Sequence, residues 1–152
     1  MLAVDAAVAN NIYRGERNGG EVVADAGHIT ASTLLATAVA DGDKAAASIA
    51  VHALVHHRRW HIVRLRVLDT AGHVVAEDGG PYVIAPVRGS LTLNGRVVGS
   101  FLMSVQDDVG FTKLEMHAAG RPIGIYYHGT LVAHLGGRFP RTPPRCATSV
   151  PL

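Results

Sequence analysis

A chain of 152 residues that is 48% hydrophobic, with a formal net charge of +2, is long and apolar enough to bury one core. This composition excludes a chain that is disordered throughout, and the small net charge gives no reason to expect a nucleic-acid surface. Cys146 is the only cysteine, so no internal disulfide can form.

Membrane-spanning and export signals are not readable in this sequence. No apolar run approaches the roughly 20 residues that cross a bilayer. The N-terminus also lacks the basic segment and apolar core of a signal peptide. The sequence therefore predicts either a cytosolic chain or a soluble piece of a larger protein.

The N-terminal part of the chain has the apolar spacing of helices. One helix is expected over residues 2–13. The glycines that follow it, Gly15, Gly19 and Gly20, then weaken the helical pattern. A second helix is expected over residues 21–40, with Gly27 as a break inside it.

A third helix is expected over residues 44–58. A turn is expected just before it at Asp41-Gly42-Asp43, because Gly42 accepts a positive φ and Asp43 can cap the helix. The residues expected on the inner face of this helix are Ala46, Ile49, Ala50, Ala53, Leu54 and His57.

From Val63 onward the apolar residues recur at every second position, which indicates a strand with one face on a core. Hairpin turns are expected at Ala71-Gly72, Asn94-Gly95 and Ala119-Gly120, and Asn-Gly is the strongest signal of this kind. The expected strands are 63–68, 73–77, 82–87, 91–93, 96–106, 111–118, 122–127 and 131–134.

Helices followed by antiparallel hairpins predict an α+β domain. We expect N-terminal helices packed on a central antiparallel sheet of about five to six strands. The chain then divides into an N-terminal helix with a Gly-rich connection (1–20), the domain itself (21–135) and a loose C-terminal tail (136–152).

One side of the strand predicted over residues 96–106 is apolar, and the other is mixed. The mixed side could line a polar pocket, or it could be a partly solvated sheet face. Arginine side chains beside it could grip a carboxylate in a bidentate fork, although Arg66 is expected to be a surface residue. The candidate ligand-binding residues are Arg64, Tyr82, Arg88, Ser100, Ser104, Gln106 and Tyr126.

Histidines gather around the end of the third predicted helix. His52 and His56 are spaced so that two imidazoles could share one metal ion. No HExxH pattern is present, no carboxylate lies nearby in sequence, and both histidines are expected on the outer face of the helix. A solvated basic face is therefore expected, and neither a metal nor a cofactor is predicted.

No motif in the sequence marks a catalytic site. Asp107-Asp108 is expected to form a turn or cap rather than an acid–base pair, since adjacent residues in an extended segment point in opposite directions. Gly-x-Ser-x-Gly, P-loop and dinucleotide-binding patterns are absent.

The order of these segments resembles a known family. One part of the chain resembles the entry of Cache domains, the PAS-like sensor modules of bacterial membrane receptors. This part consists of Val39-Ala40-Asp41-Gly42-Asp43, a short helix and then VRLRVLDTAGHVV. The segment IAPVRGSLTLNGRVVGSFLMSVQDD resembles the central hairpin of that family. The resemblance covers roughly residues 21–134.

This resemblance implies a single-Cache-type, extracytoplasmic sensor domain without catalysis, which belongs to a histidine kinase, chemoreceptor or cyclase. Such domains bind a small polar molecule, often a carboxylate or an amino acid, and signal through paired helices in a homodimer. Contact with a membrane would come only through a parent receptor outside this chain. The alternatives are a PAS-like or profilin-like protein-interaction domain, a small His-dependent metal enzyme and a cytoplasmic location.

Overall fold

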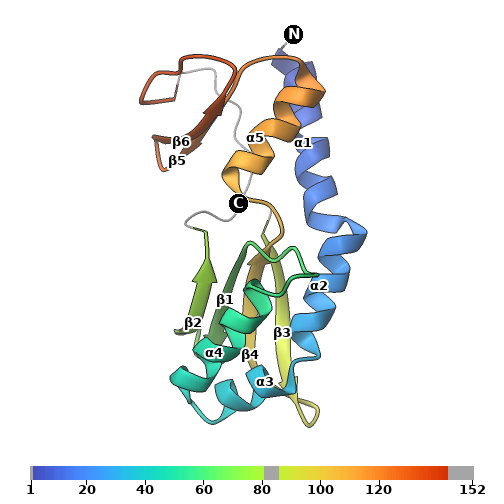
Figure 1. Ribbon diagram of the computed structural model, residues 1–152, viewed down its shortest axis with the longest axis vertical. Helices are drawn as coiled ribbons and strands as arrows, with labels where there is room; N and C mark the ends of the chain where they lie inside the picture. The colour runs from blue at the N-terminus through green and yellow to red at the C-terminus, as the bar shows by residue number, and fades with distance from the viewer. Residues whose placement is uncertain (1, 81–85, 144–152) are drawn as a thin grey trace.

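The computed structural model describes residues 2–80 and 86–143. In this part of the chain, four helices come first, and strands follow from residue 64 onward with one further helix among them (Figure 1). The helices are α1 (Leu2–Asn18), α2 (Gly20–Thr30), α3 (Thr33–Ala40), α4 (Lys44–Val55) and α5 (Asp108–Ala119). The strands are β1 (Arg64–Asp69), β2 (Val74–Gly79), β3 (Val87–Leu93), β4 (Arg96–Ser104), β5 (Ile123–Tyr127) and β6 (Thr130–Leu135).

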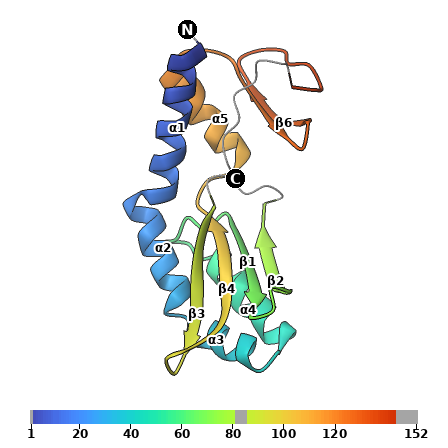
Figure 2. The ribbon, with the colours of Figure 1, turned by 180° about the vertical axis from the view of Figure 1, so that it is seen from behind.

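The main sheet has four antiparallel strands in the order β2-β1-β4-β3. Helices α2, α3 and α4 pack on one of its faces. Figure 2 shows the opposite face, which no helix in the described part of the chain covers. We call it the open face. Strands β5 and β6 form a separate sheet beside α5, which itself packs against α1.

The predicted α+β class is confirmed. A single sheet of five to six strands is not found, because the described strands divide into a sheet of four and a sheet of two. The predicted strand over residues 82–87 falls mostly outside the described residues, and β3 begins at Val87.

The core lies between the main sheet and helices α2–α4. Leu65 and Val67 of β1 and Phe101 and Met103 of β4 are buried in it, so the predicted alternation of these strands is confirmed. The helices contribute the buried residues Val22, Ile29, Leu35, Ala38, Val39, Ala47, Val51 and Leu54.

Turn chemistry places the first two predicted hairpin turns and the cap of α4 where the sequence predicts them. Asn94 and Gly95 have φ values of 51° and 77°, which suit the tight turn between β3 and β4. Asp43 caps α4 by accepting a hydrogen bond from the Ala46 amide at 3.0 Å. Gly72 has a φ of 86° in the turn between β1 and β2.

Several helix boundaries differ from the prediction. Helix α1 continues through Gly15 to Asn18. The break predicted at Gly27 lies instead at Ser32, whose side chain accepts a hydrogen bond from the Leu35 amide and begins a new helix. Helix α4 ends at Val55, three residues earlier than expected.

The inner face predicted for α4 is also partly wrong. Ile49 is 72% exposed, whereas Ala47 and Val51 are fully buried. The run of alanines in this helix gives a weak amphipathic contrast, so its apolar residues alone do not fix which way the helix is rotated.

The strand predicted over residues 111–118 is wrong, because this segment lies in helix α5. Asp107 caps the helix by accepting a hydrogen bond from the Gly110 amide, which confirms the cap role expected for this aspartate. Gly120 ends the helix with a φ of 64°, so Ala119-Gly120 is a helix C-cap rather than a hairpin turn. The residues of α5 that turn inward are Phe111, Thr112, Glu115 and Met116, which have helical rather than strand spacing.

Helix α5 also buries a carboxyl group. Glu115 is buried, its Oε1 atom has no hydrogen-bond partner among the described residues, and burial raises its pKa. The protonated form therefore fits the fold better than the charged form, and the stability that it provides is lost as the pH rises through the raised pKa.

We expect Glu115→Gln to raise the melting temperature at pH 7, because the amide keeps the shape of the side chain and never ionises. Thermal unfolding of both proteins between pH 4 and pH 8 measures this effect. The difference should shrink as the pH falls and Glu115 takes up its proton. A constant difference across this range would contradict the burial of a charged carboxylate.

Candidate functional site

The open face of the main sheet is the candidate site, because the mixed side of β4 lies on it. Its strand register places Leu102 of β4 between Arg66 of β1 and Arg88 of β3. These three residues form one row across the strands. In the neighbouring row, Ser100 lies between Leu68 and Ser90. Since adjacent strands lie about 4.8 Å apart, the backbones at Arg66 and Arg88 are separated by about 10 Å.

A carboxylate on β2 holds two of the arginines. Glu77 Oε2 lies 2.8 Å from a terminal nitrogen of Arg64 and 2.8 Å from Nε of Arg66. The hydrogen bond from Arg66 and the charges of both guanidinium groups outweigh desolvation and lower the pKa of Glu77. The cluster therefore keeps one negative charge between two positive ones.

Arg64, a predicted ligand-binding residue, is engaged within the fold. Its side chain is only 13% exposed and donates a hydrogen bond to the carbonyl oxygen of Gly80 in addition to its ion pair with Glu77. Arg64 therefore anchors the end of β2 and is not directed to solvent.

Arg88 and Arg66 are the accessible cations of this face. Arg88 is exposed and forms no ion pair with any residue that the structure describes. The side chain of Arg66 is 39% exposed and meets Glu77 through Nε. The sequence assigned Arg66 to the surface, but the register places it in the same row as Arg88.

The predicted polar residues of β4 have different environments. Ser100 is half-buried in the middle of the open face. Ser104 is buried at the end of the strand, where its hydroxyl donates to the carbonyl oxygen of Gln106 at 2.8 Å. Gln106 lies beyond the strand, next to the cap of α5. Of these three residues, Ser100 is the one that lies partly exposed in the row next to Arg66, Leu102 and Arg88.

Of the two predicted tyrosines, Tyr126 is not brought to this face. Tyr126 is in β5, and its hydroxyl donates to the carbonyl oxygen of Pro140 at 2.8 Å. Tyr82 lies outside the described residues.

A separate shallow hollow of about 370 Å³ lies along α1, and its lining residues are Asn10, Tyr13, Arg14, Arg17 and Asn18.

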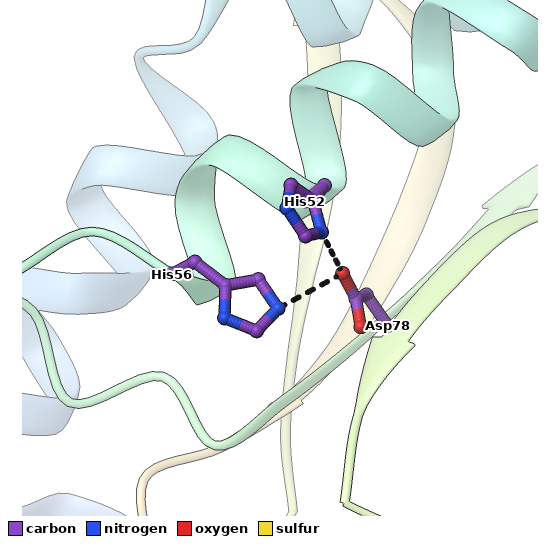
Figure 3. A group of neighbouring side chains, drawn as sticks. All are labelled: His52, His56 and Asp78. Carbon is purple, nitrogen blue, oxygen red and sulfur yellow. Dashed lines mark hydrogen bonds and ion pairs between the residues drawn. The ribbon is translucent and has the colours of Figure 1, made fainter.

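A second cluster joins α4 to β2 on the helix-covered side of the sheet (Figure 3). Asp78 Oδ2 lies 2.7 Å from Nδ1 of His52 and 3.3 Å from Nε2 of His56. Sequence reasoning found the histidine pair but missed Asp78. The available signal was strand alternation, which points Asp78 toward the helices when Glu77 points to the open face.

No helix in the described part of the chain is by itself long and apolar enough to cross a membrane. The stretches Asn10–Thr30 and Thr33–Ala40 meet that test only together, across a bend of 53°. No protein-family model, curated protein or solved structure matches this chain.

Proposed function

We propose that this protein is a non-catalytic recognition domain that binds a small anionic molecule, such as a carboxylate or an amino acid, on its open face. The observation that carries the proposal is the row in which Arg66 and Arg88 flank Leu102 on a sheet face that none of the described helices covers. A role in signal input, outside the cytoplasm and in a homodimer, is the part of the proposal that rests on the resemblance to Cache domains.

The chemistry of the row suits a compact anion. Two guanidinium groups can approach it from both sides, and each can offer two parallel N–H donors to a carboxylate. Leu102 forms an apolar floor between them, and the hydroxyl groups of Ser90 and Ser100 lie in the next row. Glu77 would repel a second negative charge near Arg66 and would attract the ammonium group of an amino acid.

A thermal-shift screen against small carboxylates and amino acids tests the proposal, followed by calorimetric titration of the ligand that stabilises the protein most. Arg88→Gln and Arg66→Gln should each weaken binding by about tenfold or more, because a hydrogen bond to a charged group contributes about 1.5–3 kcal/mol. Arg96→Gln, in the turn region of β4, is the matched control and should leave the affinity unchanged.

If no ligand in the screen raises the melting temperature, or if Arg96→Gln weakens binding as much as Arg88→Gln, the row of arginines is not the recognition site. Equal weakening by Arg96→Gln and Arg88→Gln would mean that the loss of one positive charge anywhere on the protein lowers the affinity.

A second candidate function is protein binding through the same face. Half-buried Leu68 and Leu102 lie in adjacent rows of this face, which gives it apolar as well as charged surface. Protein binding predicts a dimer or complex that dissociates on Leu102→Arg, whereas binding of a small anion predicts a monomer–dimer equilibrium that this substitution leaves unchanged.

A further inference from the structure

The cluster of His52, His56 and Asp78 has the composition of a metal site. His52 lies on α4, and His56 is the C-cap residue one helical turn further on, so their rings lie on the same side of the helix end, with centroids 4.2 Å apart. Asp78 reaches them from β2, and the candidate ligand atoms of all three residues lie within 4.8 Å of one another.

The separations suit a tetrahedral ion. Zinc binds imidazole nitrogens and carboxylate oxygens at about 2.0–2.2 Å, which places two ligand atoms of a tetrahedron about 3.3 Å apart. The distance between His56 Nε2 and Asp78 Oδ2 already has this value at 3.3 Å. The His52 contact, at 2.7 Å, needs only a small side-chain adjustment.

The carboxylate is also oriented as a metal ligand must be. Its Oδ1 atom accepts a hydrogen bond from the Gly79 amide at 2.6 Å, which turns Oδ2 toward the two imidazoles.

Both imidazoles are largely exposed, with side chains 67% and 56% accessible. A bound ion would therefore keep at least one position open to water. Histidine and carboxylate ligands together favour zinc and its neighbours in the transition series over magnesium and calcium, which prefer oxygen ligands alone.

We propose that His52, His56 and Asp78 bind one Zn²⁺ ion that ties helix α4 to the edge strand β2. This inference is independent of the ligand proposed for the open face. The ion would lie at the end of β2, one residue from Glu77, and so would fix the strand that holds Arg64 and Arg66 on the other side of the sheet.

Calorimetric titration of the chelator-treated full chain with Zn²⁺ tests the proposal. We expect one ion per chain and a rise in melting temperature when Zn²⁺ is added. His52→Ala, His56→Ala and Asp78→Asn should each weaken binding at least tenfold and remove the rise in melting temperature.

His73→Ala is the matched control, because His73 also pairs with a carboxylate, Asp69 at 3.2 Å, without a second imidazole in that pair. It should bind Zn²⁺ with the same affinity as the unsubstituted chain. Circular dichroism in the presence of chelator establishes that each variant is folded, and Asp78→Asn serves as the near-isosteric variant if a histidine replacement unfolds.

Two results would overturn the proposal. The first is the absence of a saturable Zn²⁺ site in the unsubstituted chain. The second is binding that Asp78→Asn and both histidine variants leave unchanged, which would place the ion at other histidines.

Discussion

We expect Phe101→Ala to lower the free energy of unfolding by about 3–5 kcal/mol, the range found for removing a buried aromatic side chain from a core. Phe101 is among the largest fully buried side chains in the described part of the chain. Its ring lies over Gly89 of β3, so close that a Cβ atom on that glycine would come within 2.3 Å of the ring. Removing the ring therefore leaves a cavity beside a residue that has no side chain to fill it.

Chemical denaturation monitored by circular dichroism measures this loss. Leu102→Ala is the matched control, because the neighbouring residue in β4 is half-buried and points to the open face. We expect it to reduce stability clearly less than Phe101→Ala. Equal losses would mean that the core does not lie between the sheet and helices α2–α4.

We expect Gly79→Ala to lower the free energy of unfolding by about 3 kcal/mol, because two unfavourable effects combine at this position. Gly79 has a φ of 104°, which side chains rarely allow. A Cβ atom would also lie 2.2 Å from the carbonyl oxygen of Val63 and 2.7 Å from Cα of Arg64. The end of β2 would have to move away from β1 and release Arg64 from the Gly80 carbonyl.

Gly80→Ala provides the control for this prediction. A Cβ atom at Gly80 would meet its nearest neighbour, the Val63 carbonyl oxygen, at 3.9 Å, which is ordinary contact. Urea unfolding should therefore show a large loss for Gly79→Ala and a small change for Gly80→Ala. The same loss for both would contradict the close approach of β2 to residue 63.

Local patterns in the sequence predicted much of the main sheet. Alternation over residues 63–68 identified the buried Leu65 and Val67, and Asn94-Gly95 placed the hairpin of β3 and β4. The segment 111–118 was misread because Asp107 and Gly120 are common to turns and to helix caps. Only the helical spacing of Phe111, Glu115 and their neighbours distinguishes the two.

The candidate site was less accessible to sequence reasoning, because register brings together residues that are far apart in the chain. The sequence could not show that Glu77 forms an ion pair with Arg64. Nor could it show that Arg66 and Arg88 lie on either side of Leu102 in one row of the sheet. Asp78 was missed for the same reason, since it meets His52 across 26 residues. Short-range spacing identifies a histidine pair but not the strand that completes it.

The most direct test of recognition on the open face is a two-dimensional amide NMR titration of the ¹⁵N-labelled chain with a small dicarboxylate such as succinate, or with the ligand found by the thermal-shift screen. We predict saturable shifts that centre on Arg66, Arg88, Ser90, Ser100 and Leu102, and their loss in Arg88→Gln. Shifts confined to the α1 hollow around Arg14 and Arg17, or no saturable shift with any ligand of the screen, would contradict the account.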